Sequence, residues 1–190
     1  TDMRRRAMKS ECEHWLTVTD DLEWRRTHIH DPSIPLGATL EALAFDAPKR
    51  ILEIGCGYGR LTTEIAKRYP DAHVTGIDIN PKILPESTEI TYMCQGNLDG
   101  LPTQDAIYSV ALFQHLPSDA KRAYIEAAAG LLNPGGVLRI QFIEGIRDNF
   151  VDHWVPLAYM RRWFTVAGLK VSNVDQGLAH PQWTWITGVK

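Results

Sequence analysis

Three glycines at alternate positions follow a short apolar strand, and they constrain the fold of this chain more than any other feature. The segment reads Ile51-Leu-Glu-Ile-Gly-Cys-Gly-Tyr-Gly59, and a helical pattern begins directly after it. Glycine has no Cβ and tolerates positive φ, so a backbone turns in this way when it passes very close to a ligand. A second apolar strand, 73–77, ends in Asp78. Together these elements predict a nucleoside pocket at the carboxyl ends of two parallel strands.

Two classes of ligand use this layout, and the residues beside the glycines separate them. Dinucleotide sites need Gly-x-Gly-x-x-Gly, which turns a helix N-terminus toward a pyrophosphate. Here Arg60 stands where the third glycine would be, and Glu53 lies two residues before the first glycine. A carboxylate at that place repels phosphate and attracts an ammonium group. The pattern favours a cationic nucleoside, with a dinucleotide as the more distant alternative.

The segment resembles the nucleotide-binding motif of class I S-adenosylmethionine-dependent methyltransferases. In that family acid-x-Gly-x-Gly-x-Gly holds the methionine end of the cofactor. The resemblance implies that Gly55, Cys56, Gly57 and Gly59 form the turn that presents backbone groups to the methionine, and that Glu53 faces its ammonium directly or through water. The alternative is a tight strand-to-helix turn without a ligand.

Asp78 and Ile79 are the candidates for the nucleoside itself. A carboxylate accepts hydrogen bonds from two vicinal hydroxyls, so Asp78 suits the ribose, and Ile79 is placed to pack on the adenine face. Because Asn80-Pro81 follows, Asp78 has a second interpretation as a turn or capping acid.

The segment Gln95-Gly-Asn-Leu-Asp-Gly-Leu-Pro102 resembles the family's Gly-Asp-Ala-x-x-Leu-Pro, whose acid meets the adenine amino group. Asn97 replaces that acid, and its side-chain oxygen still accepts a bond from an exocyclic N–H. We expect the Leu98 backbone N–H to be the other adenine contact. Asp99 is the substitute if the loop is shifted.

Phe113-Gln-His-Leu-Pro117 lies where the fourth strand is expected to end, facing the transferable methyl group. It is not the Asn-Pro-Pro-Tyr or Asp-Pro-Pro-Tyr motif of amino-methylating enzymes that act on nucleic acids. It resembles the x-x-His-His-Leu of many small-molecule methyltransferases, which implies that Phe113 and Gln114 line the cofactor. His115 is the catalytic candidate, as a general base near neutral pH. The alternative is a histidine that anchors the next helix through hydrogen bonds.

Strands and helices alternate along the chain, which predicts an α/β fold with a mostly parallel, Rossmann-like sheet and helices on both faces. Seven strands are expected, the last two forming an antiparallel C-terminal edge hairpin. Ser118 is the expected N-cap of the fourth helix and Gly168 the stop of the last. The expected strands are 49–54, 73–79, 90–94, 105–113, 137–142, 169–174 and 183–189, and the expected helices are 8–22, 36–45, 60–69, 116–132 and 157–167.

The length of 190 residues predicts one domain. We divide it into an N-terminal lid or cap segment, 1–33, and a Rossmann-like core, 34–190. A tight turn is expected at 133–136 and a loop at 144–155. The lid and this loop would cover an acceptor held over the ends of strands four and five.

The bulk composition argues against several partners. A net charge of −3 and a pI of about 6.1 give no field toward nucleic acid or membrane, although Arg4-Arg5-Arg6 has phosphate contact as an alternative to a solvated tail. No cysteine or histidine spacing matches a zinc pattern, and the spacing of Asp148, Asp152 and His153 is no recognised ligand set, so no metal is expected. No apolar run approaches the ~20 residues of a membrane span. The cytoplasm is the expected compartment.

The resemblance therefore implies S-adenosylmethionine-dependent methyl transfer to a small molecule. Two alternatives stay open: an RNA or protein methyltransferase, and a non-catalytic S-adenosylmethionine-binding module. The sequence identifies neither the acceptor, nor the methylated atom, nor the oligomeric state.

Overall fold

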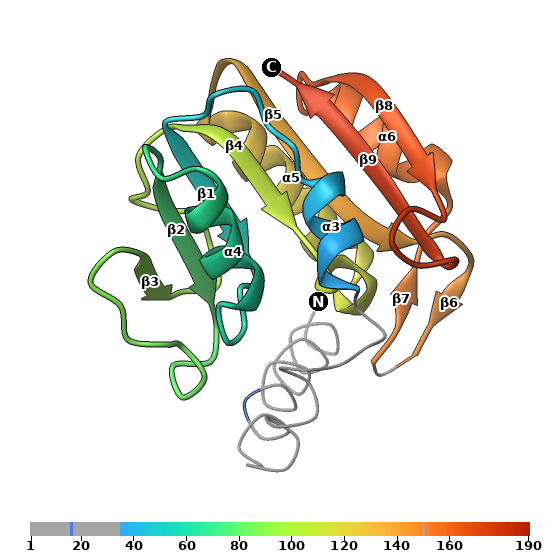
Figure 1. Ribbon diagram of the computed structural model, residues 1–190. Coiled ribbons are helices and arrows are strands. Elements are labelled where there is room, and N and C mark those ends of the chain that lie inside the picture. Colours follow the sequence, from blue (N-terminus) through green and yellow to red (C-terminus); the bar gives the residue numbers. More distant parts are fainter. Residues whose placement is uncertain (1–15, 17–34, 150) are drawn as a thin grey trace.

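The computed structural model describes Leu16, residues 35–149 and residues 151–190 (Figure 1). The expected lid 1–33 and the expected helix 8–22 lie outside the described residues, apart from Leu16, which is helical.

A seven-stranded sheet of order β3-β2-β1-β4-β5-β9-β8 forms the centre of the chain (Figure 1). Strands β1 to β5 pair in parallel, while β9 is antiparallel to both β5 and β8. The mostly parallel sheet and its C-terminal hairpin are thereby confirmed. The strands are β1 Arg50–Ile54, β2 His73–Asp78, β3 Thr91–Cys94, β4 Gln104–Ser109, β5 Leu132–Ile143, β8 Lys170–Gln176 and β9 Trp183–Val189.

Helices cover both faces of this sheet, as predicted. Helices α3 and α4 pack on one face over Ile51 and Tyr108, and α5 and α6 pack on the other over Leu52 and Ile140 (Figure 1). Neighbouring residues of one strand thus enter opposite cores, which is why the central strands read as continuously apolar. The helices are α3 Leu36–Ala42, α4 Arg60–Arg68, α5 Ser118–Leu131 and α6 Leu157–Val166.

Strand β4 is shorter than its sequence predicts. It ends at Ser109 instead of residue 113, because Ala111 turns the backbone with φ +57° and Phe113–His115 form a short 3-10 helix, η1. Ser118 was expected as the N-cap of α5, and this is wrong. Pro117 is the N-cap residue, and no side chain caps the helix.

Two expected irregular segments carry strand structure. The predicted turn 133–136 belongs to β5, where the Gly135 N–H donates to the Lys190 carbonyl at 2.9 Å. The predicted loop 144–155 contains a second, two-stranded sheet of β6 Arg147–Asp148 and β7 His153–Trp154. This β6–β7 hairpin lies at the same edge of the main sheet as the carboxyl end of β5 (Figure 1). Helix α3 also ends three residues early, at Ala42.

Candidate functional site

The glycine turn joins the carboxyl end of β1 to the start of α4. All three glycines have positive φ: +76° at Gly55, +52° at Gly57 and +69° at Gly59. A Cβ at Gly55 would lie 2.8 Å from Leu112, and one at Gly59 would lie 2.9 Å from Pro85. A Cβ at Gly57 would meet no atom within 4 Å. Packing therefore accounts for two of the glycines, whereas Gly57 faces open space.

The turn is tied to the end of β2 by its own N–H groups. Gly55 and Cys56 both donate to the Ile77 carbonyl at 2.9 Å, and Gly57 donates to Asp78 Oδ2 at 3.0 Å. The backbone groups of these three residues were expected to meet the methionine, and in this structure their N–H groups are engaged within the protein. The carbonyl oxygens of the turn remain as hydrogen-bond acceptors. They can bind the ammonium group of a methionine, but not its carboxylate.

The Cys56 side chain is buried against β2. A Cβ built on Gly76 would lie 2.9 Å from the Cys56 Cβ, so the thiol fills the space that a glycine leaves on the neighbouring strand. Burial raises the pKa of the Cys56 thiol, with the carboxyl groups of Glu53 and Asp78 adding to the effect. The Cys56 thiol therefore stays protonated at neutral pH, and its role here is to pack against β2.

Asp78 closes the rim beside the turn. Its Oδ2 accepts from Gly57, and its Oδ1 accepts from the Asn80 N–H at 3.0 Å. Burial raises the pKa of Asp78, and these backbone bonds oppose that rise. Asp78 therefore has the role of a turn acid, the second of its two interpretations. Because a carboxylate oxygen accepts more than one hydrogen bond, ribose binding by Asp78 stays a prediction as well.

Glu53 lies on β1 beneath the turn, between Tyr108 of β4 and Thr62 of α4, and is only 2% exposed. The Tyr108 hydroxyl donates to Glu53 Oε2 at 2.9 Å, and the Thr62 hydroxyl donates to the same oxygen. Burial raises the pKa of Glu53 to about 8, although the bonds from Thr62 and Tyr108 lower it. An approaching ammonium would favour the ionised form. Glu53 was expected to meet the ammonium either directly or through water. Because its carboxyl group is buried, the structure favours the contact through water.

The expected adenine residues surround the end of β3. Ile79 is half-buried, and its Cγ2 would be 3.0 Å from a Cβ at Gly96. Asn97 is exposed, and its Oδ1 accepts the Asp99 N–H at 3.2 Å. Leu98 is buried in the core and anchors the loop. The structure brings the three into one loop cluster beside Asp78, and their contact with adenine stays a prediction.

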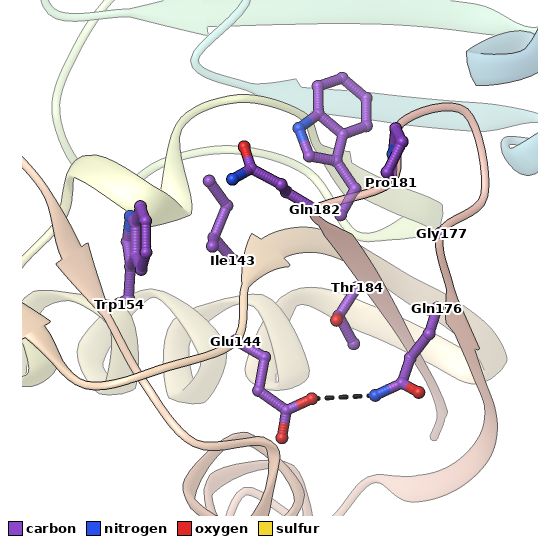
Figure 2. Close-up of a pocket in the computed structure, with 9 residues that line it drawn as sticks. Ile143, Glu144, Trp154, Gln176, Gly177, Pro181, Gln182 and Thr184 are labelled. Carbon is purple, nitrogen blue, oxygen red and sulfur yellow. Dashed lines mark hydrogen bonds between the residues drawn. The ribbon is translucent and has the colours of Figure 1, made fainter.

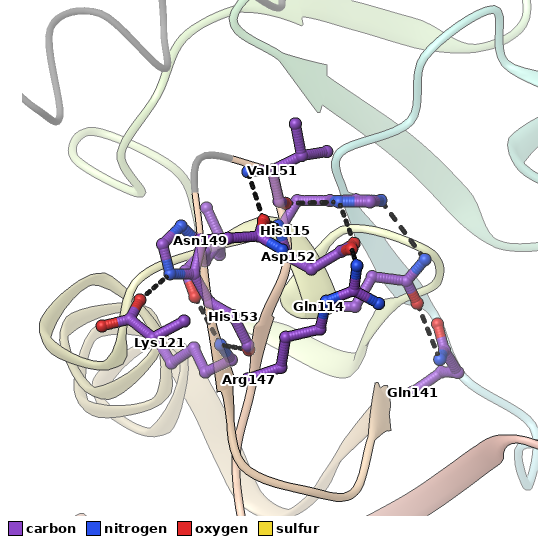
Figure 3. A network of polar contacts seen from close by, with 11 residues as sticks. Gln114, His115, Lys121, Gln141, Arg147, Asn149, Val151, Asp152 and His153 are labelled. Carbon is purple, nitrogen blue, oxygen red and sulfur yellow. Dashed lines mark hydrogen bonds and ion pairs between the residues drawn. The ribbon is translucent and has the colours of Figure 1, made fainter.

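Phe113 and Gln114 were both expected to line the cofactor, but they differ in burial. The Phe113 side chain is fully buried and lies with its ring centroid 6.3 Å from that of Tyr124, so it belongs to the core and leaves only its backbone for a cofactor. Gln114 is half-buried, and its amide joins a polar network that reaches the β6–β7 hairpin (Figure 3).

His115 is held at both ring nitrogens. Nδ1 lies 2.9 Å from the Val151 carbonyl, and Nε2 lies 3.2 Å from Gln114 Nε2 (Figure 3). Burial lowers the pKa of His115, so the neutral ring is favoured. The anchoring role expected for this histidine is present, but the partner is the hairpin and not the following helix. A neutral imidazole is also the form that a general base requires.

The sequence analysis missed Lys121 and Gln141, whose hydrogen bonds hold the segment around His115 in place. Lys121 is fully buried on α5, and its ammonium donates to the carbonyls of Leu116 and His153. It thereby joins the start of α5 to the hairpin. A charge at a buried helix position requires such partners, but the sequence does not show which positions of α5 are buried. Gln141 is equally buried, on β5.

A cavity of about 390 Å³ opens beside the network, at the carboxyl ends of β5 and β8 (Figure 2). Among the residues that line it, Gln176 Nε2 donates to Glu144 Oε2 at 2.9 Å, and Trp154 and Trp183 contribute aromatic rings. The cavity lies on the edge of the sheet where the acceptor was expected, but its lining comes mainly from the ends of β5, β9 and β8 and not from β4.

Within residues 35–149 and 151–190, no three His, Cys, Asp or Glu side chains are grouped as a metal site would require. No helix in the same residues has the length and apolar character needed to cross a membrane.

The comparisons with known proteins agree with this geometry. Residues 51–136 match the family model of a methyltransferase domain. The chain contains a class I methyltransferase domain.

Curated relatives of this domain include a trans-aconitate 2-methyltransferase of Rhodopseudomonas palustris, 30% identical over 135 residues, which are 68% of this chain and 52% of the relative. A methyltransferase of Strobilurus tenacellus, str2, is 33% identical over 137 residues, or 68% of this chain and 49% of the relative. The chain spans about half the length of the curated relatives it matches.

Solved structures show the same fold. The magnesium protoporphyrin IX methyltransferase of Synechocystis superposes with a TM-score of 0.66 at 16% identity, covering 94% of this chain and 90% of that one. The mitomycin 7-O-methyltransferase MmcR gives a TM-score of 0.72 at 12% identity, covering 93% and 60%.

Proposed function

We propose that this chain binds S-adenosylmethionine on the rim made by the glycine turn and Asp78, and that it catalyses transfer of the methyl group to a small molecule. The named relatives support the reaction class, since they are methyltransferases that include enzymes named for small acceptors.

The observation that carries the proposal is the open space at Gly57. A residue with φ near +52° can be Asn or Asp as well as Gly, and no neighbouring atom excludes a side chain there. The positive φ alone favours glycine here, as it does at Gly135, and the open space at the carboxyl end of β1 leaves room for the close approach of a nucleoside. The hydrogen bond from Gly57 to Asp78 supports the proposal, because it joins the residues that we assign to the methionine and to the ribose.

The residues fit the cationic cofactor in their chemistry. Acceptors surround the turn: its carbonyl groups, the buried carboxyl of Glu53 and the carboxylate of Asp78. The cofactor, when bound, supplies an electrophilic methyl group, and the protein has to supply alignment. We assign ribose binding to Asp78 and adenine contacts to Ile79, Asn97 and the Leu98 N–H. The acceptor would lie over the ends of β4 and β5, next to His115.

A matched pair of glycine variants tests the proposal. Gly57→Ala and Gly135→Ala both place a Cβ in open space at positive φ, +52° and +79°. Each is expected to lower the free energy of unfolding by about 1 kcal/mol. Only Gly57→Ala should weaken the binding of S-adenosylhomocysteine, by tenfold or more in calorimetry, because its methyl group enters the ligand space.

Equal affinity in the two glycine variants would reject the assigned rim. Methyl transfer is then followed with a labelled cofactor and a panel of small metabolites. Binding without any transfer would favour the non-catalytic binding module over the enzyme.

A further inference from the structure

A continuous chain of hydrogen bonds crosses from β5 to the β6–β7 hairpin through His115 (Figure 3). The Ala111 N–H donates to Gln141 Oε1 at 2.7 Å, and Gln141 Nε2 donates to Gln114 Oε1 at 3.1 Å. Gln114 Nε2 then lies 3.2 Å from His115 Nε2, and His115 Nδ1 lies 2.9 Å from the Val151 carbonyl. We refer to these five residues as the amide relay.

Backbone groups fix the direction of the relay at both ends. An N–H can only donate, so Ala111 requires the oxygen of Gln141, and the amides then place the Gln114 N–H against His115 Nε2. Nε2 must therefore carry a lone pair. From the other end, the Val151 carbonyl can only accept, so Nδ1 must carry the proton. The two ends assign the same tautomer independently, and no donor in the relay faces another donor.

We infer that Gln141 is a positioning residue, which acts through Gln114 to hold His115 as the neutral Nδ1–H tautomer with its Nε2 lone pair presented to the Gln114 amide. As a step in catalysis this rests on the proposed function. A hydroxyl of the acceptor could replace the Gln114 N–H as the donor to Nε2, which is the arrangement that general-base catalysis needs. Gln141 suits such a role because it is fully buried on a central strand, where its rotamer is fixed by packing.

The relay also resists protonation of His115. A proton on Nε2 would face the Gln114 N–H, and turning the Gln114 amide over would set its N–H against that of Gln141. Charged and titratable groups among the described residues act on the ring besides the relay. The Asp152 carboxylate, 3.8 Å from Nδ1, favours the imidazolium, while Lys121 and His153 oppose it. Arg147 pairs with Asp152 at 3.4 Å and weakens its pull.

NMR of the imidazole nitrogens in the whole wild-type chain tests the assignment without any variant. The expected spectrum of His115 at neutral pH shows a protonated Nδ1 and a bare Nε2. A protonated Nε2 with a bare Nδ1 would overturn the inference. The measurement needs neither cofactor nor acceptor, so its failure is distinct from a failure to bind S-adenosylhomocysteine.

Gln141→Leu tests the positioning role by pH titration of the same signals. Without Gln141 the Gln114 amide can turn over and accept from a protonated Nε2, so the proton affinity of His115 should rise about tenfold. In the Gln114→Leu background the same change should have no effect, because there is no amide to turn.

An unchanged titration in Gln141→Leu, or the same shift in both backgrounds, would overturn the positioning role. Circular dichroism checks folding, since Gln141→Leu leaves the Ala111 N–H unpaired. If Gln141→Leu does not fold, the relay is tested by the tautomer of His115 in the wild type and by the pH titration of Gln114→Leu. Loss of the donor to Nε2 in Gln114→Leu must raise the proton affinity of His115, and no rise would overturn the relay.

Discussion

Glu53→Gln is the most informative single substitution beneath the glycine turn. Glutamine keeps the shape of the side chain and an oxygen for Tyr108 and Thr62, but it cannot ionise. The variant therefore isolates the energetic consequence of holding a carboxyl group at this depth.

The pKa of Glu53 gives the sign and the size of the effect. Burial raises that pKa from 4.5 to about 8 in the folded protein. Between these two values the folded state binds more protons than the unfolded state, so Glu53 makes the free energy of unfolding fall as the pH rises. From about pH 5 to about pH 8 the loss amounts to roughly 3–4 kcal/mol at 1.36 kcal/mol per pH unit, and it is complete above the folded pKa.

Urea denaturation of the wild type and of Glu53→Gln, at about pH 5 and about pH 8, measures this loss. Any cost of placing an amide among these donors is the same at both pH values, so it cancels in the comparison. The stability of the variant relative to the wild type should improve by roughly 3–4 kcal/mol across the range. A pH-independent difference between the two proteins would contradict a raised pKa of Glu53 in the folded state.

Two further substitutions distinguish effects on ligand affinity from effects on folding stability. Asp78→Asn removes the charge of the proposed ribose ligand, so calorimetry should show S-adenosylhomocysteine binding weakened by tenfold or more, and wild-type affinity would reject the role of Asp78. Gly188→Ala places a Cβ 2.5 Å from Phe164 Cδ1, far from the rim, and should lower the free energy of unfolding by about 1–3 kcal/mol while the affinity stays unchanged. Wild-type stability in that variant would contradict the close packing of β9 against α6.

The sequence predicts the order of strands and helices well because long elements have clear patterns. The parallel strands are apolar on both faces, and the glycine turn, Pro70 and Gly168 mark boundaries that the structure keeps. Gly168 follows α6 with φ +84°, as a C-terminal stop should.

The errors fall where local composition has two structural outcomes. Residues 110–113 are as apolar as a strand, but they turn at Ala111 into η1, and burial alone does not distinguish these forms. The two-residue strands of the β6–β7 hairpin are too short to show any periodicity. Pro117 takes the N-cap place because its extended backbone ends the preceding turn.

The positions of the candidate residues in the fold were predictable from the sequence, whereas the hydrogen bonds that join them to the rest of the chain were not. Each motif residue lies at the edge where the sequence places it. The partners of Glu53 and His115 come from elsewhere in the chain: Tyr108 is on β4, and Val151 is in the hairpin. Contacts over such separations depend on strand order and register, which a single sequence does not state.

A crystal structure of the chain with S-adenosylhomocysteine is the decisive measurement for the proposed cofactor site. We expect the ribose hydroxyls within hydrogen-bond distance of the Asp78 carboxylate, and the homocysteine portion in the open space above Gly57. Density for the nucleoside at any other place on the chain, or none at saturating ligand, would contradict this assignment.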